Sequence, residues 1–470
     1  MVFALATVPA NAADVLVLNP DGRTFERFDP GVASIGPERP SPHLGVRTAA
    51  TAAAVTPLTE FKRMFAAGQI DQAAYDNARG VYKDAVAFTR RLTGRRLLEM
   101  QGQLAVLGRI AAGGLLTPSR VAPLVLQLQR NREWWGKGPL LASGARVSFA
   151  GTQLVFQYFP GEGLQIHPLA NFGKLNALWT SGRTNKMTAL MNEELAIAAE
   201  RAGGIAWEYY FDFDGGRPPW VSSLSQGTAL QALARASSKA GVYDVVLPVI
   251  ERGLTIFQTP PPVGVRTAAD GGYHYVQYSF APSLRILNGF IQALTGLYDF
   301  AKITGSPEAQ QLFTQGDIAA RKEVPTFDTG SWSLYSRGSI TRESDLSYHQ
   351  LLTLFLHNLC DRTGTPVYCD TAARFGDDEK VAPALTLLTT TVHRKRPNAL
   401  QFKLSKISRV SLTLNRGGKT VYSYAATLGY GTRSVTVTPP AGAKAYAVRI
   451  SATDLAGNTS SIAGTVKIVK

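Results

Sequence analysis

The chain has 470 residues, of which 45% are apolar and 18% charged. This balance fits a globular protein of two or three domains and excludes a disordered chain. No apolar run approaches the roughly 20 residues that cross a bilayer. The formal net charge is +15, but residues 394–470 hold 13 basic residues and one acid (+12), whereas residues 1–393 hold 36 and 33 (+3). The charge therefore belongs to a tail module, for which we expect an anionic glycan, cell-wall or membrane partner and no nucleic acid.

The N-terminal segment predicts export. Residues 1–12, MVFALATVPANA, are apolar and end in an Ala-x-Ala cleavage pattern, so they resemble the back half of a signal peptide. We therefore expect a secreted or cell-envelope protein of bacterial type. Residues 13–54 are rich in Pro, Gly and Ala without sustained periodicity, which predicts an extended lead-in that packs on the body.

Helical periodicity dominates the next 330 residues. Apolar residues recur at three- and four-residue spacing, and a hairpin at 145–158 interrupts them once. Successive helices without βαβ alternation predict a mainly α domain over residues 55–385, an α/α toroid-type helical barrel with a β-hairpin insertion. No fixed repeat is present, which favours a closed barrel over a solenoid. We expect helices over 57–65, 75–88, 92–107, 118–135, 172–180, 184–201, 243–257, 283–303, 306–321 and 346–360, and one after Trp220.

The tail has a different pattern. Helical periodicity stops near Gly376, and the polybasic run 393–397 predicts a linker. Beyond it, VSLTLN, KTVYSYAAT, SVTVTP, AYAVRISATD and GTVKIV alternate as short strands between Gly, Asn and Pro turns. This predicts a small all-β Ig-like sandwich over residues 394–470. Such modules usually anchor an enzyme, so we expect it to bind cell wall or glycan.

The two cysteines, Cys360 and Cys369, flank a Thr-Gly-Thr-Pro segment. In an exported protein they could form a disulfide; two unpaired thiols are the alternative. We predict no metal site, because no His or second Cys pair lies at ligand spacing. Asp212 and Asp214 alone give only a weak calcium signal.

Three stretches are rich in aromatic residues. Residues 273–290 alternate phenols and polar residues, and Pro282 then suits the first turn of a helix with an apolar stripe. Residues 207–235 combine an aromatic strand, a Gly-Gly-Arg-Pro-Pro break and a helix. Residues 327–349 run from FDTGS through Tyr335 to Tyr348.

These stretches resemble the C-terminal catalytic domain of D-glucuronyl C5-epimerases, which turn glucuronate into iduronate within heparan-type chains. The resemblance covers roughly residues 205–362, and the order of its short motifs makes it specific. The matching pieces are Trp220 with Ser225-Gln226-Gly227, Tyr278 before Leu287-Asn288-Gly289-Phe290, Asp328-Thr329-Gly330-Ser331 before Tyr335, and Tyr348-His349.

The resemblance implies proton transfer at carbon 5 of a uronate. Removing that proton builds negative charge on the adjacent carboxylate, which donors or cations must neutralise. Inversion also needs an acid–base group on each face of the ring. A phenol, with a pKa of ~10, can serve once a cation favours the phenolate. The family resemblance places these roles on Tyr278, Tyr335 and Tyr348, and it implies no cofactor.

Two positions depart from the family. Gln277 stands where the family has a glutamate, and an amide cannot move a proton. Either a tyrosine pair then carries all the transfer, or Tyr275, His274 or another group takes over. Leu352 occupies a position where the family often has a second histidine.

Further residues are candidates for substrate binding. Arg337 suits a bidentate carboxylate clamp, although a solvated loop Arg is the alternative. His349 either orients a phenol or contacts a sugar hydroxyl, and a structural role is again the alternative. The remaining candidates, for which structural roles are also open, are Gln277, Gln226, Asn288, Tyr275 and Trp220.

Three functions remain open from the sequence. The first is epimerisation of an anionic uronate-containing polysaccharide. A homodimer is compatible with this function. The second is a uronate polysaccharide lyase, which shares the first proton abstraction but then expels the group at carbon 4. The third is a non-catalytic glycan- or wall-binding protein, to which the cationic tail and Gln277 point.

Overall fold

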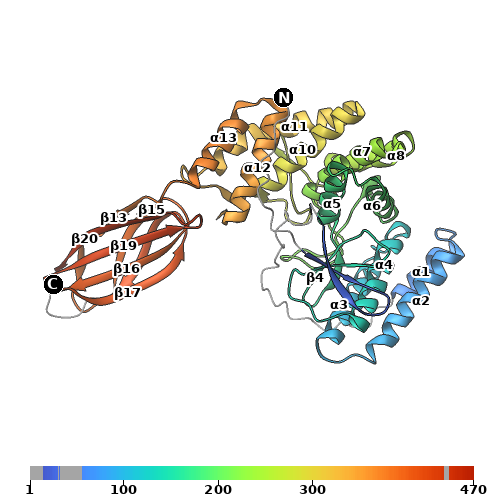
Figure 1. Ribbon diagram of the computed structural model, residues 1–470, viewed down its shortest axis with the longest axis horizontal. Coiled ribbons are helices and arrows are strands. Elements are labelled where there is room, and N and C mark those ends of the chain that lie inside the picture. The colour runs from blue at the N-terminus through green and yellow to red at the C-terminus, as the bar shows by residue number, and fades with distance from the viewer. Residues whose placement is uncertain (1–13, 30, 32–54, 439–443, 470) are drawn as a thin grey trace. The chain divides into compact units, whose positions relative to one another are not determined.

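The computed structural model of the protein describes residues 14–29, 31, 55–438 and 444–469 (Figure 1). The predicted signal peptide and most of the predicted lead-in lie outside these ranges. The chain divides into two compact units. The first comprises residues 1–282 and 292–317, and the second comprises residues 283–291 and 318–470.

The first unit opens with helices that local sequence signals fix. Thr56 forms a capping box with Thr59, and Pro57 occupies the first turn. Asp71 caps the second helix by accepting a hydrogen bond from the Ala74 N–H. The four helices expected up to residue 135 are confirmed. They are α1 (Pro57–Ala66), α2 (Gln72–Thr89), α3 (Gly94–Ala112) and α4 (Pro118–Lys137).

A five-stranded sheet of order β2-β1-β3-β4-β5 follows. The predicted hairpin is confirmed, since β3 and β4 pair antiparallel. The lead-in does pack on the body, but as strands: β1 pairs parallel to β3, about 130 residues away. Because β1 and β3 are far apart in the sequence, no local sequence pattern predicts their pairing. The strands are β1 (Asp14–Leu18), β2 (Thr24–Phe28), β3 (Arg146–Phe149), β4 (Phe156–Phe159) and β5 (Gly163–Ile166).

Helices of the first unit then pack around α7, which is buried along most of its length. Gly227 and Gly296 allow α7 to approach α10: a Cβ on Gly296 would lie 2.2 Å from the Gly227 carbonyl oxygen. The elements are α5 (Pro168–Thr180), α6 (Thr184–Ala196), α7 (Ser223–Ala240), α8 (Tyr243–Glu251), η1 (Arg252–Leu254), α9 (Thr255–Gln258), β8 (Arg266–Ala269), β9 (Gly272–Tyr275), α10 (Leu287–Thr304) and α11 (Pro307–Glu323).

Two predicted helices are shorter than expected. The helix predicted over 184–201 ends at Ala196, because the positive φ of Ala202 (56°) and Gly203 (77°) turns the chain into the hairpin of β6 (Ala199–Arg201) and β7 (Gly204–Ala206). The helix predicted over 243–257 is interrupted by the 3₁₀ turn η1.

The first element of the second unit differs from the prediction. Residues predicted as the first turn of a helix form β10 (Leu284–Ile286), and α10 begins only at Leu287. The reason is pairing with β11 (Leu334–Gly338), which places Arg285 opposite Arg337 across 52 positions of sequence. The sheet continues with β12 (Arg342–Glu343).

A helical pair follows β12. Asp345 caps α12 (Leu346–Thr363), which ends at Gly364 in the left-handed conformation (φ 62°). The sequence prediction missed α13 (Pro366–Asp378). The two helices are joined by a disulfide between Cys360 and Cys369.

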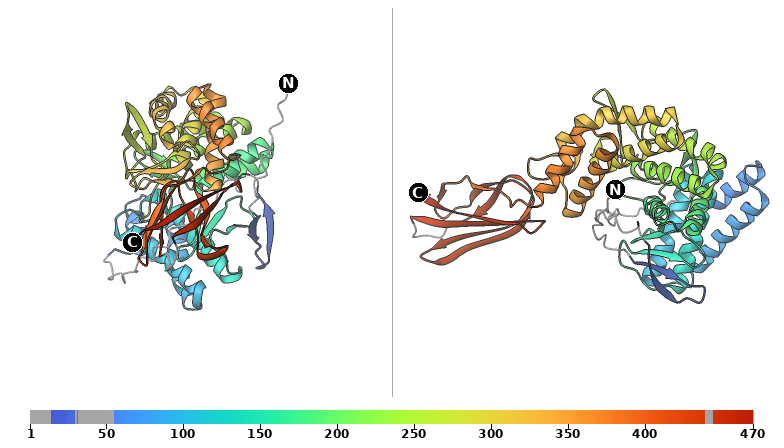
Figure 2. Two further views of the ribbon diagram at one scale, coloured as in Figure 1. Left: turned by 90° about the vertical axis from the view of Figure 1, so that its left-hand side faces the viewer. Right: turned by 45° about the horizontal axis from the view of Figure 1, so that its top comes forward.

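The rest of the second unit is a β-sandwich (Figure 2). Sheets β13-β15-β18 and β14-β20-β19-β16-β17 enclose one core that includes Phe402, Leu412 and Ile450. The five predicted strands are confirmed as β16 to β20; the Ig-like assignment stays a prediction. The strands are β13 (Leu385–Leu387), β14 (Thr391–His393), β15 (Asn398–Leu404), β16 (Ser408–Arg416), β17 (Lys419–Leu428), β18 (Gly431–Val437), β19 (Ala445–Asp454) and β20 (Thr459–Val469).

The polybasic run is part of this sandwich and not a linker. It forms the turn from β14 to β15, where the Asn398 side chain donates to the carbonyl oxygens of His393 and Arg396. Two strands precede it, so the sandwich begins at Leu385. Charged side chains favour solvent both in linkers and in turns. The charge of the run therefore could not distinguish the two, and the predicted start of the sandwich was wrong.

Among the described residues, no helix combines the length and the apolar character that spanning a membrane requires.

Candidate active site

Two predicted catalytic tyrosines are neighbours in the second unit. Tyr335 lies on β11 and Tyr348 in the first turn of α12, and their ring centroids are 4.6 Å apart at an interplanar angle of 51°. Asp345 accepts a hydrogen bond from the Tyr348 N–H (2.8 Å), which fixes the start of α12. Both residues are partly exposed.

His349 follows Tyr348 in α12 and is buried. Its imidazole stacks on Trp332, with ring centroids 3.7 Å apart and an interplanar angle of 5°. Its Nε2 lies 2.9 Å from the Phe375 carbonyl oxygen and its Nδ1 2.8 Å from Ser333 Oγ. Burial lowers the pKa of His349, so the ring is neutral. Because both nitrogens have partners within the fold, the geometry suits a positioning role for the adjacent Tyr348.

Arg337 lies two residues after Tyr335 on β11, so the two side chains share one face of the strand. Its guanidinium donates to the Thr326 carbonyl oxygen (2.9 Å) and lies 5.9 Å from the Phe327 ring. An Arg side chain has five N–H donors, so this one keeps donors for a carboxylate. Arg337, the predicted carboxylate clamp, is therefore on the same strand as the phenol of Tyr335.

The third predicted tyrosine belongs to the first unit. Tyr278 follows β9 and is 5% exposed. Its ring packs against Phe213 (5.5 Å), Trp220 (5.7 Å) and Phe280 (5.4 Å between centroids). Its hydroxyl accepts a hydrogen bond from Gln277 Nε2 (3.0 Å).

Gln277 contacts the Tyr278 hydroxyl directly. Its amide oxygen is buried and makes no hydrogen bond to any described part of the chain. The position where the family has glutamate therefore holds a neutral amide that anchors the Tyr278 hydroxyl and keeps one acceptor open.

Other predicted binding residues have partners inside the fold. Trp220 stacks on Tyr209 with centroids 4.1 Å apart, and its indole N–H donates to the Phe211 carbonyl oxygen. The Tyr275 hydroxyl donates to the Leu312 carbonyl oxygen (2.7 Å), and burial raises its pKa, which makes it a poor substitute base. Gln226 Nε2 donates to the carbonyl oxygens of Ile205 and Gly253 (3.1 Å each).

Asn288 differs from Gln226. It is 3% exposed, and its amide oxygen has no hydrogen-bond partner among the residues described. A substrate-contact role is therefore compatible with its side chain, whereas the hydrogen bonds of Gln226 suit the structural alternative. His274, on β9, is fully buried.

One functional support was missed by the sequence analysis. Glu208 is buried between two guanidiniums, with 2.7 Å contacts to Arg120 and Arg201, and it accepts from the Tyr210 hydroxyl (3.0 Å). This cluster lies at the start of the aromatic stretch whose Phe213 and Trp220 pack against Tyr278; the stretch forms isolated β-bridges and not the predicted strand. Arg120 lies 88 residues from Glu208, so no local pattern predicts the pairing.

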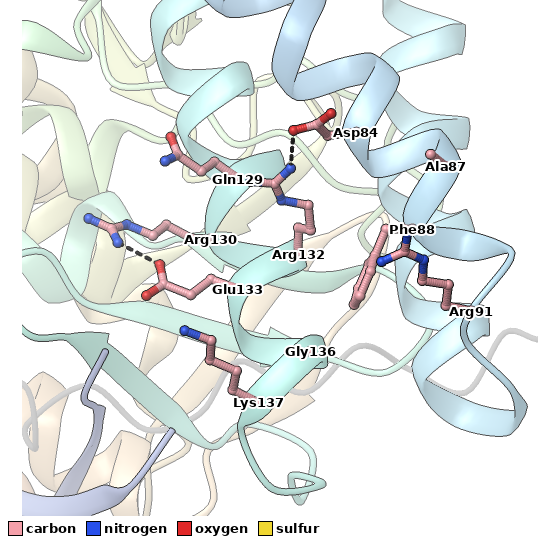
Figure 3. Close-up of a pocket in the computed structure, with 10 residues that line it drawn as sticks. All are labelled: Asp84, Ala87, Phe88, Arg91, Gln129, Arg130, Arg132, Glu133, Gly136 and Lys137. Atoms are coloured by element: carbon pink, nitrogen blue, oxygen red, sulfur yellow. Dashed lines mark hydrogen bonds and ion pairs between the residues drawn. The ribbon is translucent and has the colours of Figure 1, made fainter. Parts of the chain in front are cut away.

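A separate hollow of about 830 Å³ lies between α2 and α4 (Figure 3). Arg132 of α4 pairs with Asp84 of α2 across it, and Arg130 pairs with Glu133 within α4. None of the predicted catalytic tyrosines lines it, so we do not assign it the proton transfer. Its lining residues are Asp84, Ala87, Phe88, Arg91, Gln129, Arg130, Arg132, Glu133, Gly136 and Lys137.

The described ranges contain no group of three His, Cys, Asp or Glu side chains arranged to hold a metal ion. Asp212, one of the two carboxylates with a weak calcium signal, forms an ion pair with Arg109 (2.7 Å).

Comparison with known protein families supports the resemblance that the aromatic stretches indicated. Residues 202–377 match the family model of the D-glucuronyl C5-epimerase C-terminus. This segment is similar to that family. The match confirms the resemblance and contains Tyr278, Tyr335 and Tyr348.

Two curated relatives match at the sequence level. A D-glucuronyl C5-epimerase of Caenorhabditis elegans is 29% identical over 131 residues, which are 25% of this chain and 21% of the relative. An uncharacterized protein of Methanocaldococcus jannaschii is 27% identical over 172 residues, 35% of this chain and 54% of the relative. The matches thus span about a fifth and about half of the relatives' lengths.

Solved structures give a weaker comparison. An endo-β-1,4-glucanase of Acetobacter xylinum has a TM-score of 0.35 and 12% identity, over 48% of this chain and 74% of its own. A cellobiose 2-epimerase of Bacillus thermoamylovorans has a TM-score of 0.36 and 11% identity, over 54% and 69%. We draw neither fold nor function from scores this low, and the toroid-type closure stays a prediction.

Proposed function

We propose that the protein is a C5-epimerase that inverts glucuronate residues within a polysaccharide. The observation that carries this proposal is the match of residues 202–377 to the epimerase C-terminus, a segment that includes the adjacent phenols Tyr335 and Tyr348. The two phenol rings have centroids 4.6 Å apart, and phenols can act as acid–base groups toward a carbon acid.

In the proposed reaction a phenolate takes the proton from carbon 5. The electron pair of the broken C–H bond moves into the uronate carboxylate, and Arg337 stabilises the resulting dianion. A phenol on the opposite face then returns a proton to carbon 5, so no electrons are gained or lost. Tyr335 and Tyr348 supply phenols to one face of the sugar, because rings with centroids 4.6 Å apart leave no room for a sugar between them. The role of Tyr278 follows from the family resemblance alone.

The sandwich supports a polyanionic partner. Its single acid, Asp454, is buried against Lys406 (3.1 Å), so the charges that remain exposed on the described strands are cations. Arg409, Arg449 and Lys403 are among them. We propose that this module holds the protein on an anionic glycan or cell wall outside the cell.

A lyase is the second candidate, and Gln277 favours it. Elimination needs the same first proton abstraction but no return of a proton to carbon 5. An amide in place of the family glutamate removes one group that could return it.

The test is incubation of the purified chain with heparosan and other glucuronans, followed by proton NMR and absorbance near 230 nm. Epimerisation gives new iduronate-type signals without an absorbance rise. A rise shows the unsaturated product of a lyase. Absence of both, together with binding, would favour the non-catalytic glycan-binding alternative.

A further inference from the structure

Three cations lie on the outer face of the larger sandwich sheet, whose order is β14-β20-β19-β16-β17 (Figure 1). Arg409 is on β16, Arg449 on β19 and Lys467 on β20, and all three are exposed. Each is next to a core residue in the chain, as Arg409 is to Val410. Because side chains alternate along a strand, all three cations point outward.

The strand register places these three cations on one diagonal. Arg409 pairs with Thr453 of β19, and Arg449 lies four residues before Thr453. Arg449 pairs with Ala463 of β20, and Lys467 lies four residues after Ala463. Because neighbouring strands are antiparallel, both steps run in the same direction across the sheet. Each step is four residues along the strands and one strand across, roughly 14 Å by standard sheet spacings.

The polybasic turn extends this diagonal. β14 runs parallel to β20, and Thr391 pairs with Lys467. The exposed basic residues 394–396 follow Thr391 on β14, so they continue the same direction one strand further across. We call Arg409, Arg449, Lys467 and residues 394–396 the cationic diagonal, which is about 40 Å long by the same spacings.

The outward positions between these cations carry small side chains. On β16, β19 and β20, in the rows from Arg409 to Lys467, they hold Ser, Thr, Ala and Asn, with no acidic or aromatic residue. Thr453 is the cross-strand neighbour of Arg409, and Thr413 is that of Arg449. A long ligand can therefore lie flat across the strands, beside hydroxyl groups that donate and accept hydrogen bonds.

The strand cations of the diagonal have no counter-charge. Arg409, Arg449 and Lys467 form no ion pair with another described residue, and Asp454, the one acid of residues 394–470, is buried against Lys406 (3.1 Å). Uncompensated positive charge attracts an anionic partner. Since successive cations are roughly 14 Å apart, one small anion cannot bridge two of them. The spacing therefore requires a chain with repeated anionic groups.

We propose that a linear uronate polysaccharide binds along the cationic diagonal. Its carboxylates would pair with the cations, and its sugar hydroxyls would exchange hydrogen bonds with the Ser and Thr side chains between them. Single-stranded nucleic acid is held by stacking on aromatic side chains, and membrane surfaces by inserted apolar ones, which these rows lack. The proposal deepens the anchoring proposed above and rests on it.

The test is the affinity of the full chain for immobilised heparosan, with excess heparosan disaccharide present to fill sites that take a single uronate. Two double variants each remove two exposed cations from the sandwich. Arg409→Ser/Arg449→Ser interrupts the diagonal, whereas Lys403→Ser/Lys419→Ser changes β15 and the end of β17, away from it. The first should weaken binding roughly fivefold or more and the second less than about twofold. Both should melt like wild type, because the changes are exposed.

Chain length is the second readout. Wild-type affinity should rise with oligosaccharide length until the ligand spans about 40 Å, because each further cation is then engaged within one complex. Arg409→Ser/Arg449→Ser should flatten this rise. Reduction of the carboxyl groups of heparosan should weaken wild-type binding.

Several results would overturn the proposal. Equal losses in the two double variants would show that only net charge matters. Equal affinity for carboxyl-reduced heparosan would remove the uronate as ligand. Tighter binding to single-stranded DNA, or to vesicles of phosphatidylcholine and phosphatidylserine, would assign the diagonal to another partner.

Binding and turnover separate this proposal from the epimerase. Diagonal-dependent binding without carbon-5 exchange in the wild type would leave the diagonal standing and remove the epimerase. Carbon-5 exchange in the wild type, with equal affinity losses in the two double variants, would do the reverse.

Discussion

At the residue scale, the chemistry depends on how two phenols are held. Tyr335 extends from strand β11 and Tyr348 from the start of α12, where Asp345 accepts a hydrogen bond from the Tyr348 N–H. The resemblance in sequence identified these tyrosines. It did not reveal that the neighbouring His349 is enclosed by Trp332, Ser333 and Phe375, because Phe375 is 26 residues away on a helix that local periodicity did not predict.

Gln277→Glu tests the departure from the family at this scale. A carboxylate there would accept the hydrogen bond of the Tyr278 hydroxyl and add a group able to move a proton. We expect the initial rate of epimerisation to rise by roughly 10²-fold or more, the lower end of the usual range for general acid–base catalysis. Gln277→Met is the control without either function and should not raise the rate. An equal rate in Gln277→Glu and wild type would show that this position takes no part in transfer.

At the element scale, helices with caps and apolar stripes were predictable, whereas strand β10, whose partner is distant in sequence, was not. Thr56, Pro57 and Asp71 act within a few residues, so sequence alone locates α1 and α2. Strand β10 is three residues long, and its partner is some 50 residues away. Its pairing therefore overrode the helical pattern of the residues that follow.

The N-cap of α5 predicts a pH dependence of stability. His167 has a pKa of about 3 in the folded chain against ~6.5 unfolded, so the unfolded state binds the additional proton between these values. The free energy of unfolding is therefore fully maintained above pH 6.5 and falls as the pH drops toward 3. This one group should cost about 2 kcal/mol between pH 7 and pH 5.

His167→Asn is the matched variant, because Asn can cap the helix but does not titrate. Urea unfolding of the ligand-free chain at pH 7, 6 and 5 should give a flatter dependence for the variant, by up to one proton. Parallel curves for the two proteins would contradict the assignment.

The Cys360–Cys369 disulfide predicts a second effect at the element scale. It closes a loop of nine residues' separation between α12 and α13. By the loop-entropy estimate, its removal should lower the free energy of unfolding by about 2 to 3 kcal/mol. The double variant Cys360→Ser/Cys369→Ser should melt lower than wild type and be insensitive to reductant, whereas wild type should approach it on reduction. A wild-type melting curve unchanged by reductant would be inconsistent with this.

At the scale of the whole molecule, the sandwich is built into the second unit. Lys406 is 1% exposed and donates to the carbonyl oxygens of Asp378 (2.6 Å) and Val381 (2.5 Å) as well as to Asp454. Its ammonium also lies 5.2 Å from the Trp332 ring, on which His349 stacks. The sequence analysis assigned an anchoring role to the sandwich. Through Lys406 the sandwich thus contacts Trp332, on which His349, the neighbour of Tyr348, stacks.

Lys406→Met tests this contact. The change leaves the buried Asp454 carboxylate without its cation, so we expect a loss of about 3 to 5 kcal/mol in the free energy of unfolding. Lys403→Met, at an exposed lysine on β15 shortly before Lys406, should stay within about 0.5 kcal/mol of wild type. Equal stability of the two variants would show that Lys406 does not join the sandwich to the helices.

The measurement that tests the central claim most directly is incorporation of solvent deuterium at carbon 5 of heparosan, followed by proton NMR. Wild type should exchange this proton and yield iduronate signals, whereas Tyr348→Phe should reduce exchange by roughly 10²-fold or more while keeping its melting temperature. Exchange by Tyr348→Phe at the wild-type rate, or none by the wild type on any glucuronan, would contradict the account.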